Sequence, residues 1–295
     1  MKINYFFGSD SRSIPAYETL VKSNTDLSNS NVEEIKIVTL NNATKIRGKL
    51  VPNEFEAYCI KRSINYKYYD PKSVYKDMQN GLVCSFGSIF SKEFIENNQI
   101  KSNNESEGKL LLNLHLSLLP DLKGPTPIEY ALLYSYTESG VTLFCINNEV
   151  DSGYIYWSEK FTIDSNDYAT DLYRKSFELF DSFMFNKELY NKTFIDNTYT
   201  ISASNNKNKK TYKIDKCDLL LNNLNINKAK SRIKALNFIG PALYEYDSNL
   251  TLKIHSYIEG NTGIKMELSD GILYADMITP PGKNMMKASD WLRGR

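Results

Sequence analysis

The chain has 295 residues, of which 41% are hydrophobic and 24% are charged, and its formal net charge is +1. This composition is typical of a folded globular protein and excludes the disordered and fibrous classes, and the length favours two domains. No apolar run approaches the roughly 20 residues of a membrane-spanning helix, so we expect no membrane partner.

The four cysteines are far apart and form no Cys-x-x-Cys pair, which favours neither a disulfide framework nor a zinc site. A reducing compartment is the simplest expectation, and we expect no metal. The first ten residues are apolar too briefly for a secretory signal and lack an arginine-rich amphipathic pattern. We therefore expect a cytoplasmic protein, or a mitochondrial matrix protein if the source is eukaryotic.

The first half of the chain alternates short apolar runs with segments of helical spacing. This alternation predicts an α/β domain, for which we expect the bounds 1–193. The segment 41–52 is polar and basic and is predicted to be a long loop. Predicted strands are 3–9, 32–40, 64–71, 81–90, 109–120 and a hairpin at 140–163, and predicted helices are 13–23, 53–63, 128–139 and 168–191.

The second half has a different character. Residues 194–210 are polar and lysine-rich and are predicted to be a linker, and 211–295 carry a helix at 225–237 followed by short strand-like runs. Such runs, separated by Gly, Asn and Asp, predict a small β-barrel or sandwich. Residues 206–295 have a net charge of +6 and the remainder −5. This asymmetry indicates either a polyanionic partner or a lysine-rich composition without that function.

One strand carries polar residues in an unusual pattern. In the stretch Leu111–Pro120, Asn113 and His115 alternate with leucines, so both side chains point to one face near the end of a strand. Ligands of open α/β sheets lie beyond the carboxyl ends of the strands, and Asp151 lies in a turn that can reach the same place. An amide that stabilises an oxyanion, an imidazole and a carboxylate suit acyl transfer to an amine. The alternative is a structural histidine on a half-exposed strand.

The stretch from Asn113 to Gly153 also resembles the signature of the folate-dependent formyltransferases. The family pattern Asn-x-His-x-Ser-Leu-Leu-Pro, a Gly-x-x-Pro loop, Gly-Val-Thr and Asp-Ser/Thr-Gly is present here at Asn113, His115, Ser117–Pro120, Gly124–Pro127, Gly140–Thr142 and Asp151–Gly153.

This resemblance implies a Rossmann-like catalytic domain that uses 10-formyltetrahydrofolate as formyl donor. Asn113, His115 and Asp151 match the family's catalytic residues: the amide stabilises the oxyanion, the imidazole assists the tetrahedral intermediate, and the carboxylate holds the imidazole and helps to deprotonate the amine. The resemblance also implies a folate pocket formed by Phe86, Gly87, Ser88, Ile89, Ser117, Leu118, Leu119 and Pro120.

Two further segments resemble methionyl-tRNA formyltransferases in particular. Residues 39–71 contain a basic Arg-Gly loop, in which Arg47 and Lys49 are implied to enter the tRNA major groove. Residues 211–294 resemble the family's OB-like β-barrel, which contacts tRNA backbone, and phosphate contacts dominate such affinity. Lys207, Lys209 and Lys210 are either tRNA contacts or linker residues that keep the segment soluble.

The resemblance implies formylation of the α-amine of initiator methionyl-tRNA by a monomer, in translation initiation. Two alternatives stay open: a sugar-nucleotide N-formyltransferase, and a non-catalytic RNA-binding relative. The chain departs from the family pattern at Leu116, Lys123, Glu149 and Tyr154, and the last two leave folate affinity or rate open.

Overall fold

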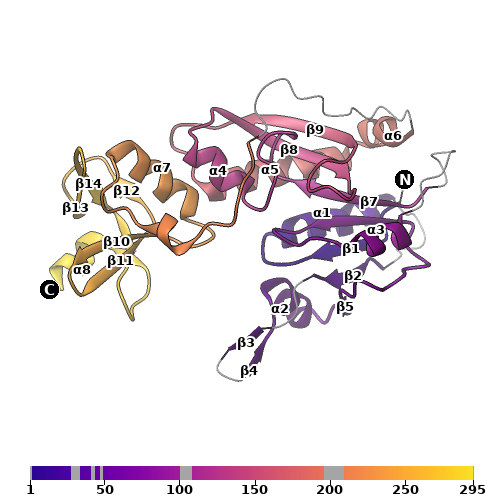
Figure 1. The fold of residues 1–295 in the computed structure, drawn as a ribbon, viewed down its shortest axis with the longest axis horizontal. Coiled ribbons are helices and arrows are strands. Elements are labelled where there is room, and N and C mark those ends of the chain that lie inside the picture. Colours follow the sequence, from indigo (N-terminus) through magenta and orange to yellow (C-terminus); the bar gives the residue numbers. More distant parts are fainter. Residues whose placement is uncertain are drawn as a thin grey trace. The chain divides into compact units, whose positions relative to one another are not determined.

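The structure is a computed structural model that describes residues 2–27, 34–40, 44–46, 49–99, 108–195 and 209–294. The chain divides into two compact units, drawn in Figure 1. Two short segments of the first half of the chain group with the C-terminal residues in one unit. The predicted domain bounds at 193 and 211 remain predictions. Unit 1 comprises Met1–Pro125, Gly140–Phe161 and Lys175–Lys210, and unit 2 comprises Thr126–Ser139, Thr162–Arg174 and Thr211–Arg295.

A mixed seven-stranded sheet forms the centre of the α/β fold, in the order β5-β2-β1-β6-β7-β8-β9 (Figure 1). The strands from β5 to β7 pair in parallel, and β8 runs antiparallel to β7. This arrangement confirms the predicted α/β class. The strands are β1 (Tyr5–Gly8), β2 (Lys36–Thr39), β5 (Tyr66–Tyr68), β6 (Asn80–Cys84), β7 (Leu110–His115), β8 (Glu138–Cys145) and β9 (Ile155–Thr162).

The central strands are apolar on both faces because both faces of the sheet are covered. On one side of β1, the Phe6 ring lies 5.4 Å from Tyr17 and 5.5 Å from Phe55, measured between ring centroids. On the other side, Phe7 makes an edge contact with Phe94 at 6.1 Å. Alternation along β1 therefore sends successive aromatic rings into two separate core layers.

Local sequence signals explain where several helices begin. The side chain of Asn53 accepts a hydrogen bond from the backbone N–H of Glu56, and the Glu56 side chain accepts one from the Asn53 N–H, which is a complete capping box at α2. Ser91 caps α3 in a similar way. The helices are α1 (Ser13–Leu27), α2 (Glu54–Lys61), α3 (Lys92–Asn98), α4 (Pro127–Leu133), α5 (Ala169–Phe185), α6 (Lys187–Ile195), α7 (Ile226–Leu236) and α8 (Ala288–Arg293), with a 3-10 turn, η2, at Lys216–Leu219.

The C-terminal part of unit 2 contains two antiparallel sheets, with orders β10-β11-β15-β16 and β12-β14-β13. These sheets are consistent with the predicted small β domain, whereas the OB-like barrel stays a prediction. Helix α4 packs against α7 within this unit. The strands are β10 (Ala242–Asp247), β11 (Leu250–Ile254), β12 (Tyr257–Ile258), β13 (Ile264–Leu268), β14 (Gly271–Ala275), β15 (Met277–Thr279) and β16 (Met286–Lys287).

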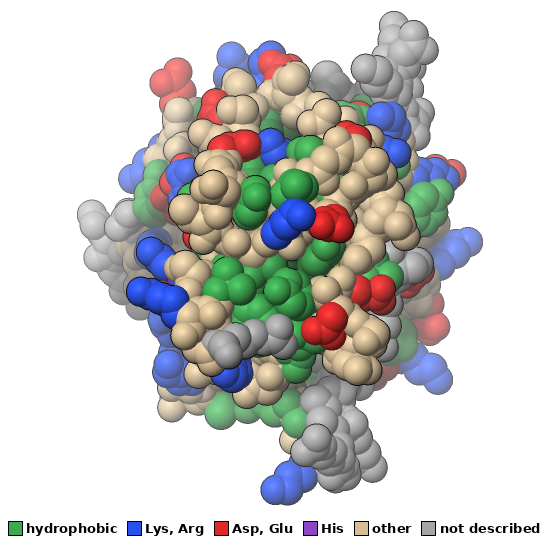
Figure 2. Space-filling view, turned by 90° about the vertical axis from the view of Figure 1, so that its left-hand side faces the viewer, with side chains coloured by type: hydrophobic (Ala, Val, Ile, Leu, Met, Phe, Trp, Pro, Cys, Tyr) green, Lys and Arg blue, Asp and Glu red, His purple; other side chains and the backbone are tan. Residues whose placement is uncertain are grey.

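On the face drawn in Figure 2, hydrophobic side chains gather in the middle, and most of the Lys, Arg, Asp and Glu side chains lie around them. A net charge alone therefore does not describe the surface that a polyanion would meet. The exposed large hydrophobic side chains of this part of the chain include Ile258, Ile272, Met285 and Leu292.

Some sequence predictions of local structure were wrong. The segment 41–52 contains an antiparallel strand pair, β3 (Thr44–Ile46) with β4 (Lys49–Val51), where a loop was predicted. Its charged and polar residues obscured the β-forming ones. The predicted helix 168–191 is two helices, because Asn186 ends the hydrogen bonding of α5 and its side chain accepts from the Leu189 N–H to begin α6. Helix α3 was not predicted.

Candidate active site

Strand β7 brings Asn113 and His115 to one cavity of unit 1. Leu111, Leu112 and Leu114 are buried in the core and fix the strand in the sheet. The register places Asn113 opposite Phe144 and His115 opposite Thr142 on β8. Because side chains alternate along a strand, Asn113 and His115 point the same way, and both line the cavity.

The cavity has a volume of about 230 Å³. It lies beyond the carboxyl ends of β6 and β7, where open α/β sheets bind ligands. Its wall combines apolar side chains with a few polar groups, a composition usual for small-molecule sites. The lining residues are Val83, Ser85, Gly87–Phe90, Ile95, Asn113, His115, Gly124, Pro125, Phe144 and Ile146–Asp151.

The imidazole of His115 is buried and held in one tautomer. Its Nε2 lies 3.0 Å from the carbonyl oxygen of Leu122. A carbonyl only accepts hydrogen bonds, so Nε2 carries the proton and the lone pair of the neutral ring is on Nδ1. The Phe144 ring packs edge-on at 6.4 Å between centroids. The nitrogen without a proton, Nδ1, lies on the side of the ring that faces Asp151. The catalytic role of His115 stays a prediction.

Asp151 faces the free nitrogen of His115. Its carboxylate oxygen Oδ2 lies 3.7 Å from Nδ1, too far for a hydrogen bond but close enough to stabilise a protonated ring. The same oxygen accepts a 2.7 Å hydrogen bond from the Gly124 N–H. Asp151 also has φ = +48°, a left-handed conformation that costs energy for most residues but that Asp tolerates.

Two polar side-chain atoms in the cavity wall have no hydrogen-bond partner among the described residues. They are Oδ1 of Asn113 and Oγ of Ser88, and both are buried. An unsatisfied buried polar atom costs roughly 1–3 kcal/mol, so two of them facing one cavity indicate a place for a polar ligand.

The predicted folate residues divide into two groups. Gly87, Ser88 and Ile89 line the cavity, and Gly87 has φ = +86°, which allows the backbone to turn there. Phe86 and Ser117–Pro120 are not among the lining residues. The latter form a turn that Thr142 holds, because its hydroxyl donates to the Ser117 carbonyl at 2.6 Å and accepts from the Leu119 N–H at 3.1 Å.

The predicted tRNA residues are only partly described. Lys49 is exposed at the start of β4, and Lys209 and Lys210 are exposed at the end of the predicted linker. Arg47 and Lys207 lie outside the described residues. The described lysines are thus accessible to a polyanion, and their role stays a prediction.

The four departures from the family pattern have different surroundings. Leu116 is 1% exposed and is a core residue that anchors the end of β7. The Lys123 ammonium donates to the Ser152 hydroxyl at 2.7 Å. Glu149 lines the cavity, whereas Tyr154 does not. Of Glu149 and Tyr154, the two departures for which the effect on folate affinity is undecided, Glu149 is the one that lines the cavity.

Sequence reasoning named no role for several groups that build this site. The Leu122 carbonyl and the Gly124 N–H orient His115 and Asp151, yet both are backbone groups and leave no side-chain signal. The glycine and proline of the Gly124–Pro127 loop were the only available hint. No cluster of three or more metal-ligating side chains occurs in the described part of the chain, and no helix there is long and apolar enough to cross a membrane.

Comparison with known proteins agrees with this geometry. Residues 69–186 match the family model described as formyl transferase. The chain is 29% identical to the methionyl-tRNA formyltransferase of Flavobacterium johnsoniae over 207 residues, and 32% identical to that of Borreliella burgdorferi over 182 residues. These alignments cover 62% and 58% of this chain but 63% and 52% of the relatives, so the chain matches between half and two thirds of their length.

Solved structures share the fold at lower identity. A sugar N-formyltransferase from Shewanella is 18% identical, with a TM-score of 0.61, and the match covers 88% of this chain and 100% of that one. HypX from Aquifex aeolicus in complex with tetrahydrofolic acid is 11% identical, with a TM-score of 0.61, over 99% of this chain and 47% of that one. The solved structures show the fold that the chain shares with them. The family model and the sequence relatives show that the chain is similar to formyl transferases, with residues 69–186 matching the family model.

Proposed function

We propose that the chain transfers a formyl group from 10-formyltetrahydrofolate to the α-amine of methionine esterified to initiator tRNA. The observation that carries the proposal is the meeting of Asn113, His115 and Asp151 at one cavity, with Nδ1 of His115 3.7 Å from the Asp151 carboxylate. The formyl transferase domain and the methionyl-tRNA formyltransferase relatives support the choice of reaction and acceptor.

His115 is the proposed proton acceptor. An amine that attacks a formyl carbon must lose a proton, and the Nδ1 lone pair faces the cavity side of the ring. Because the Leu122 carbonyl holds the proton on Nε2, the ring becomes an imidazolium when Nδ1 accepts a second one. The Asp151 carboxylate then stabilises that positive charge, and the Gly124 N–H keeps the carboxylate in place. When the bond between the formyl carbon and N10 of the donor breaks, the imidazolium returns its proton to N10, and tetrahydrofolate leaves.

Asn113 is the proposed stabiliser of the formyl oxygen. That oxygen gains negative charge when the amine adds to the formyl carbon, and an amide N–H in a site shielded from water stabilises it strongly. The Asn113 amide lines the cavity on the same face as His115, and its oxygen is not held by another described group. We propose that the amide presents its NH₂ to the formyl oxygen.

The cavity suits the reactive end of a folate. The formylated folate supplies the activated one-carbon unit, and its ring system carries several hydrogen-bonding groups. The unpartnered Oγ of Ser88 and Oδ1 of Asn113 offer partners for such groups. At about 230 Å³ the cavity is smaller than the roughly 300–1,000 Å³ of pockets that enclose whole drug-sized ligands, so it fits part of the cofactor.

For the tRNA we infer contacts from the exposed lysines at the β3–β4 pair and at the end of the predicted linker. Lys49, Lys209 and Lys210 are exposed, and each contact with a phosphate contributes to affinity through counterion release. Replacing all three with glutamine should weaken binding of initiator tRNA and lower the slope of log K against log salt by up to about 0.9 for each phosphate that is no longer neutralised. Folate binding should not change.

The decisive assay supplies labelled 10-formyltetrahydrofolate with three acceptors in parallel: initiator methionyl-tRNA, elongator methionyl-tRNA and a nucleotide-linked amino sugar. We expect formylation of the initiator tRNA and little product from the other two. Turnover of the amino sugar with none of the tRNA would replace this proposal with sugar-nucleotide N-formylation, for which the full coverage of the Shewanella sugar N-formyltransferase is the favouring observation. Tight tRNA binding without any formyl transfer would indicate a non-catalytic RNA-binding protein.

A further inference from the structure

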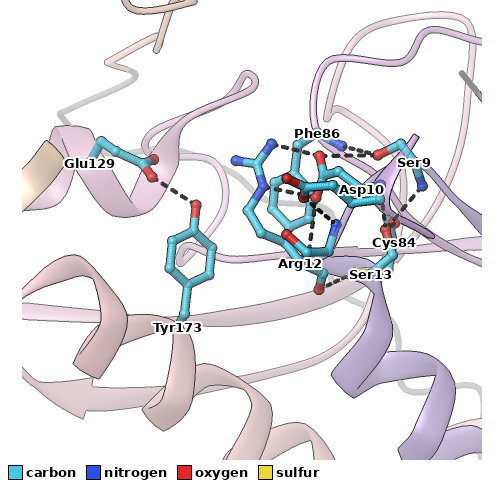
Figure 3. Close-up of polar contacts among 10 residues, drawn as sticks. Ser9, Asp10, Arg12, Ser13, Cys84, Phe86, Glu129 and Tyr173 are labelled. Atoms are coloured by element: carbon cyan, nitrogen blue, oxygen red, sulfur yellow. Dashed lines mark hydrogen bonds and ion pairs between the residues drawn. The ribbon is translucent and has the colours of Figure 1, made fainter. Parts of the chain in front are cut away.

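One wall of the cavity is a short loop, and a pair of charged residues, Arg12 and Asp10, lies next to the residue that precedes this loop. Gly87, Ser88 and Ile89 line the cavity, and Phe86 precedes them but does not line it. Figure 3 shows Phe86 within a group of polar contacts that begins at the end of β1. Strands β1 and β6 are paired so that Gly8 is opposite Cys84, which places the loops after both strands next to each other.

Arg12 is the centre of this cluster. Its guanidinium carbon lies 3.8 Å from the centre of the Phe86 ring, a cation–π contact. The same guanidinium donates two hydrogen bonds to Asp10, from Nε to Oδ1 at 3.0 Å and from the second terminal nitrogen to Oδ2 at 2.8 Å. The Arg12 side chain is only 15% exposed. A bidentate carboxylate fixes the plane of the guanidinium and so fixes the surface on which Phe86 rests.

Hydrogen bonds between serine hydroxyls and backbone groups join the segments that follow β1 and β6. The Phe86 N–H donates to the Ser9 hydroxyl oxygen at 3.3 Å, and the Ser13 hydroxyl donates to the Cys84 carbonyl at 2.6 Å. The Ser13 hydroxyl oxygen also accepts from the Ser9 N–H at 3.0 Å. The segment after β1 is thus hydrogen-bonded to the end of β6 and to the loop that follows it. Gly87, which has no side chain, is the next residue of that loop.

We propose that Arg12 is a positioning residue for the cavity: through Phe86 it holds the segment Gly87–Ile89 in the conformation that receives the formyl donor. Gly87 adopts φ = +86° and contributes no side chain to restrain itself, so the wall depends on what holds Phe86. Arg12 itself is not a lining residue. The part of this inference that concerns the donor rests on the proposed function, whereas the part that concerns the loop does not.

The loop is tested in the protein without ligand, by hydrogen exchange of the amides of Phe86 to Ile89. The variant Arg12→Ala should exchange about tenfold faster in this segment, which corresponds to removal of one partly buried cation–π interaction. Arg12→Lys keeps a positive charge near the ring but lacks the planar guanidinium, so its exchange rate should lie between those of the wild type and Arg12→Ala. Unchanged exchange in Arg12→Ala would overturn the inference, whatever the protein binds.

Arg62 supplies a matched control in the same unit. Its guanidinium lies 4.5 Å from the centre of the Tyr58 ring and 3.5 Å from the Glu18 carboxylate, so it makes the same two kinds of contact away from the cavity. Arg62→Ala should leave exchange at Phe86–Ile89 unchanged. If it accelerates exchange there as much as Arg12→Ala does, the effect is global destabilisation and Arg12 has no special role.

Binding of 5-formyltetrahydrofolate, a stable formylfolate, tests the consequence for the site. Arg12→Ala should weaken its binding about tenfold and raise KM for the formyl donor, with kcat changed much less. Because Arg12 acts through Phe86, the double variant Arg12→Ala/Phe86→Leu should bind no more weakly than Phe86→Leu alone. Additive losses would mean that Arg12 contacts the ligand directly and would overturn the positioning role. If the wild-type protein binds no formylfolate while exchange responds as expected, the proposed function fails and the role of Arg12 in the loop stands.

Discussion

Nδ1 of His115 and Oδ2 of Asp151 are 3.7 Å apart, and no proton is shared between them while the imidazole is neutral. The Leu122 carbonyl keeps the ring proton on Nε2 on the opposite side. The carboxylate thus lies on the side of the ring that carries the lone pair, where an opposite charge attracts an imidazolium. This separation is compatible with the proposed roles, in which His115 acts as a base and Asp151 stabilises its positive charge.

Replacing His115 with alanine should lower kcat by about 10²–10⁴-fold, the usual contribution of a positioned general base. Affinity for tRNA should stay within about twofold, because the ring is 6% exposed and is remote in sequence from the proposed tRNA contacts. Steady-state formylation and filter binding measure the two effects. Retained formyl transfer in this variant would remove His115 from the mechanism.

Asp151→Asn should also lower kcat, but less than His115→Ala, since the imidazole remains and loses only its charged partner. The substituted amide can still accept from the Gly124 N–H through its oxygen, so the turn should persist. A thermal melt checks that the fold is intact. A variant as active as the wild type would show that the carboxylate contributes no charge stabilisation.

Asn113→Ala should reduce kcat by about 10²–10³-fold, the typical loss when one oxyanion donor is removed. The change should not reduce stability by much, because Oδ1 of Asn113 has no described partner to lose. Asn113→Asp keeps the shape but replaces the donor with an acceptor, and we expect it to be no more active than the alanine variant. Full activity in Asn113→Asp would contradict the proposed role.

Gly153 lies so close to the last residue of β8 that a Cβ would come within 1.6 Å of the Cys145 carbonyl oxygen. Gly153→Ala should therefore displace the turn that carries Asp151, with a large fall in the melting temperature and in activity. Gly294→Ala is the control, because a Cβ there would meet its nearest neighbour at 3.7 Å. Equal melting temperatures for the two variants would mean that the turn adapts without cost.

The pair of Lys36 and Asp77 should make stability depend on pH in acid. The hydrogen bond from the Lys36 ammonium, helped by one from the Tyr5 hydroxyl, lowers the pKa of Asp77 from 3.8 to about 2. A carboxyl whose folded pKa is lowered stabilises the fold above its unfolded pKa and loses that contribution as the pH falls toward the folded value. Asp77→Asn should therefore differ from the wild type in unfolding free energy at pH 5, and the difference should shrink between about pH 4 and 2.

The size of this effect should be small, because both side chains are 53% exposed and water screens the pair. Lys36→Gln is the matching variant, and an NMR titration of the Asp77 carboxyl should show its pKa rising toward the ordinary value. A pKa that stays near 2 in Lys36→Gln would assign the shift to the Tyr5 hydroxyl.

Periodicity in the sequence was sufficient to predict most of the α/β unit. Apolar runs such as the one in β1 and the alternation of Asn113 and His115 in β7 are local, and local patterns report which face of a strand a side chain occupies. Local patterns failed at two places. Asn186 ends one helix and begins the next within a stretch of continuous helical spacing, and the β3–β4 pair forms in a segment whose composition is polar.

By itself the sequence determined which chemical groups the chain has to offer, because Asn113, His115 and Asp151 carry their chemistry wherever they are placed. Only the tertiary structure decided how those groups are arranged. The tautomer of His115 follows from the Leu122 carbonyl, the position of Asp151 follows from the Gly124 N–H, and Phe86, which precedes the cavity wall, contacts Arg12. The physical reason is that backbone hydrogen bonds and ring contacts between distant segments arise when the chain folds, and no residue spacing encodes their distances.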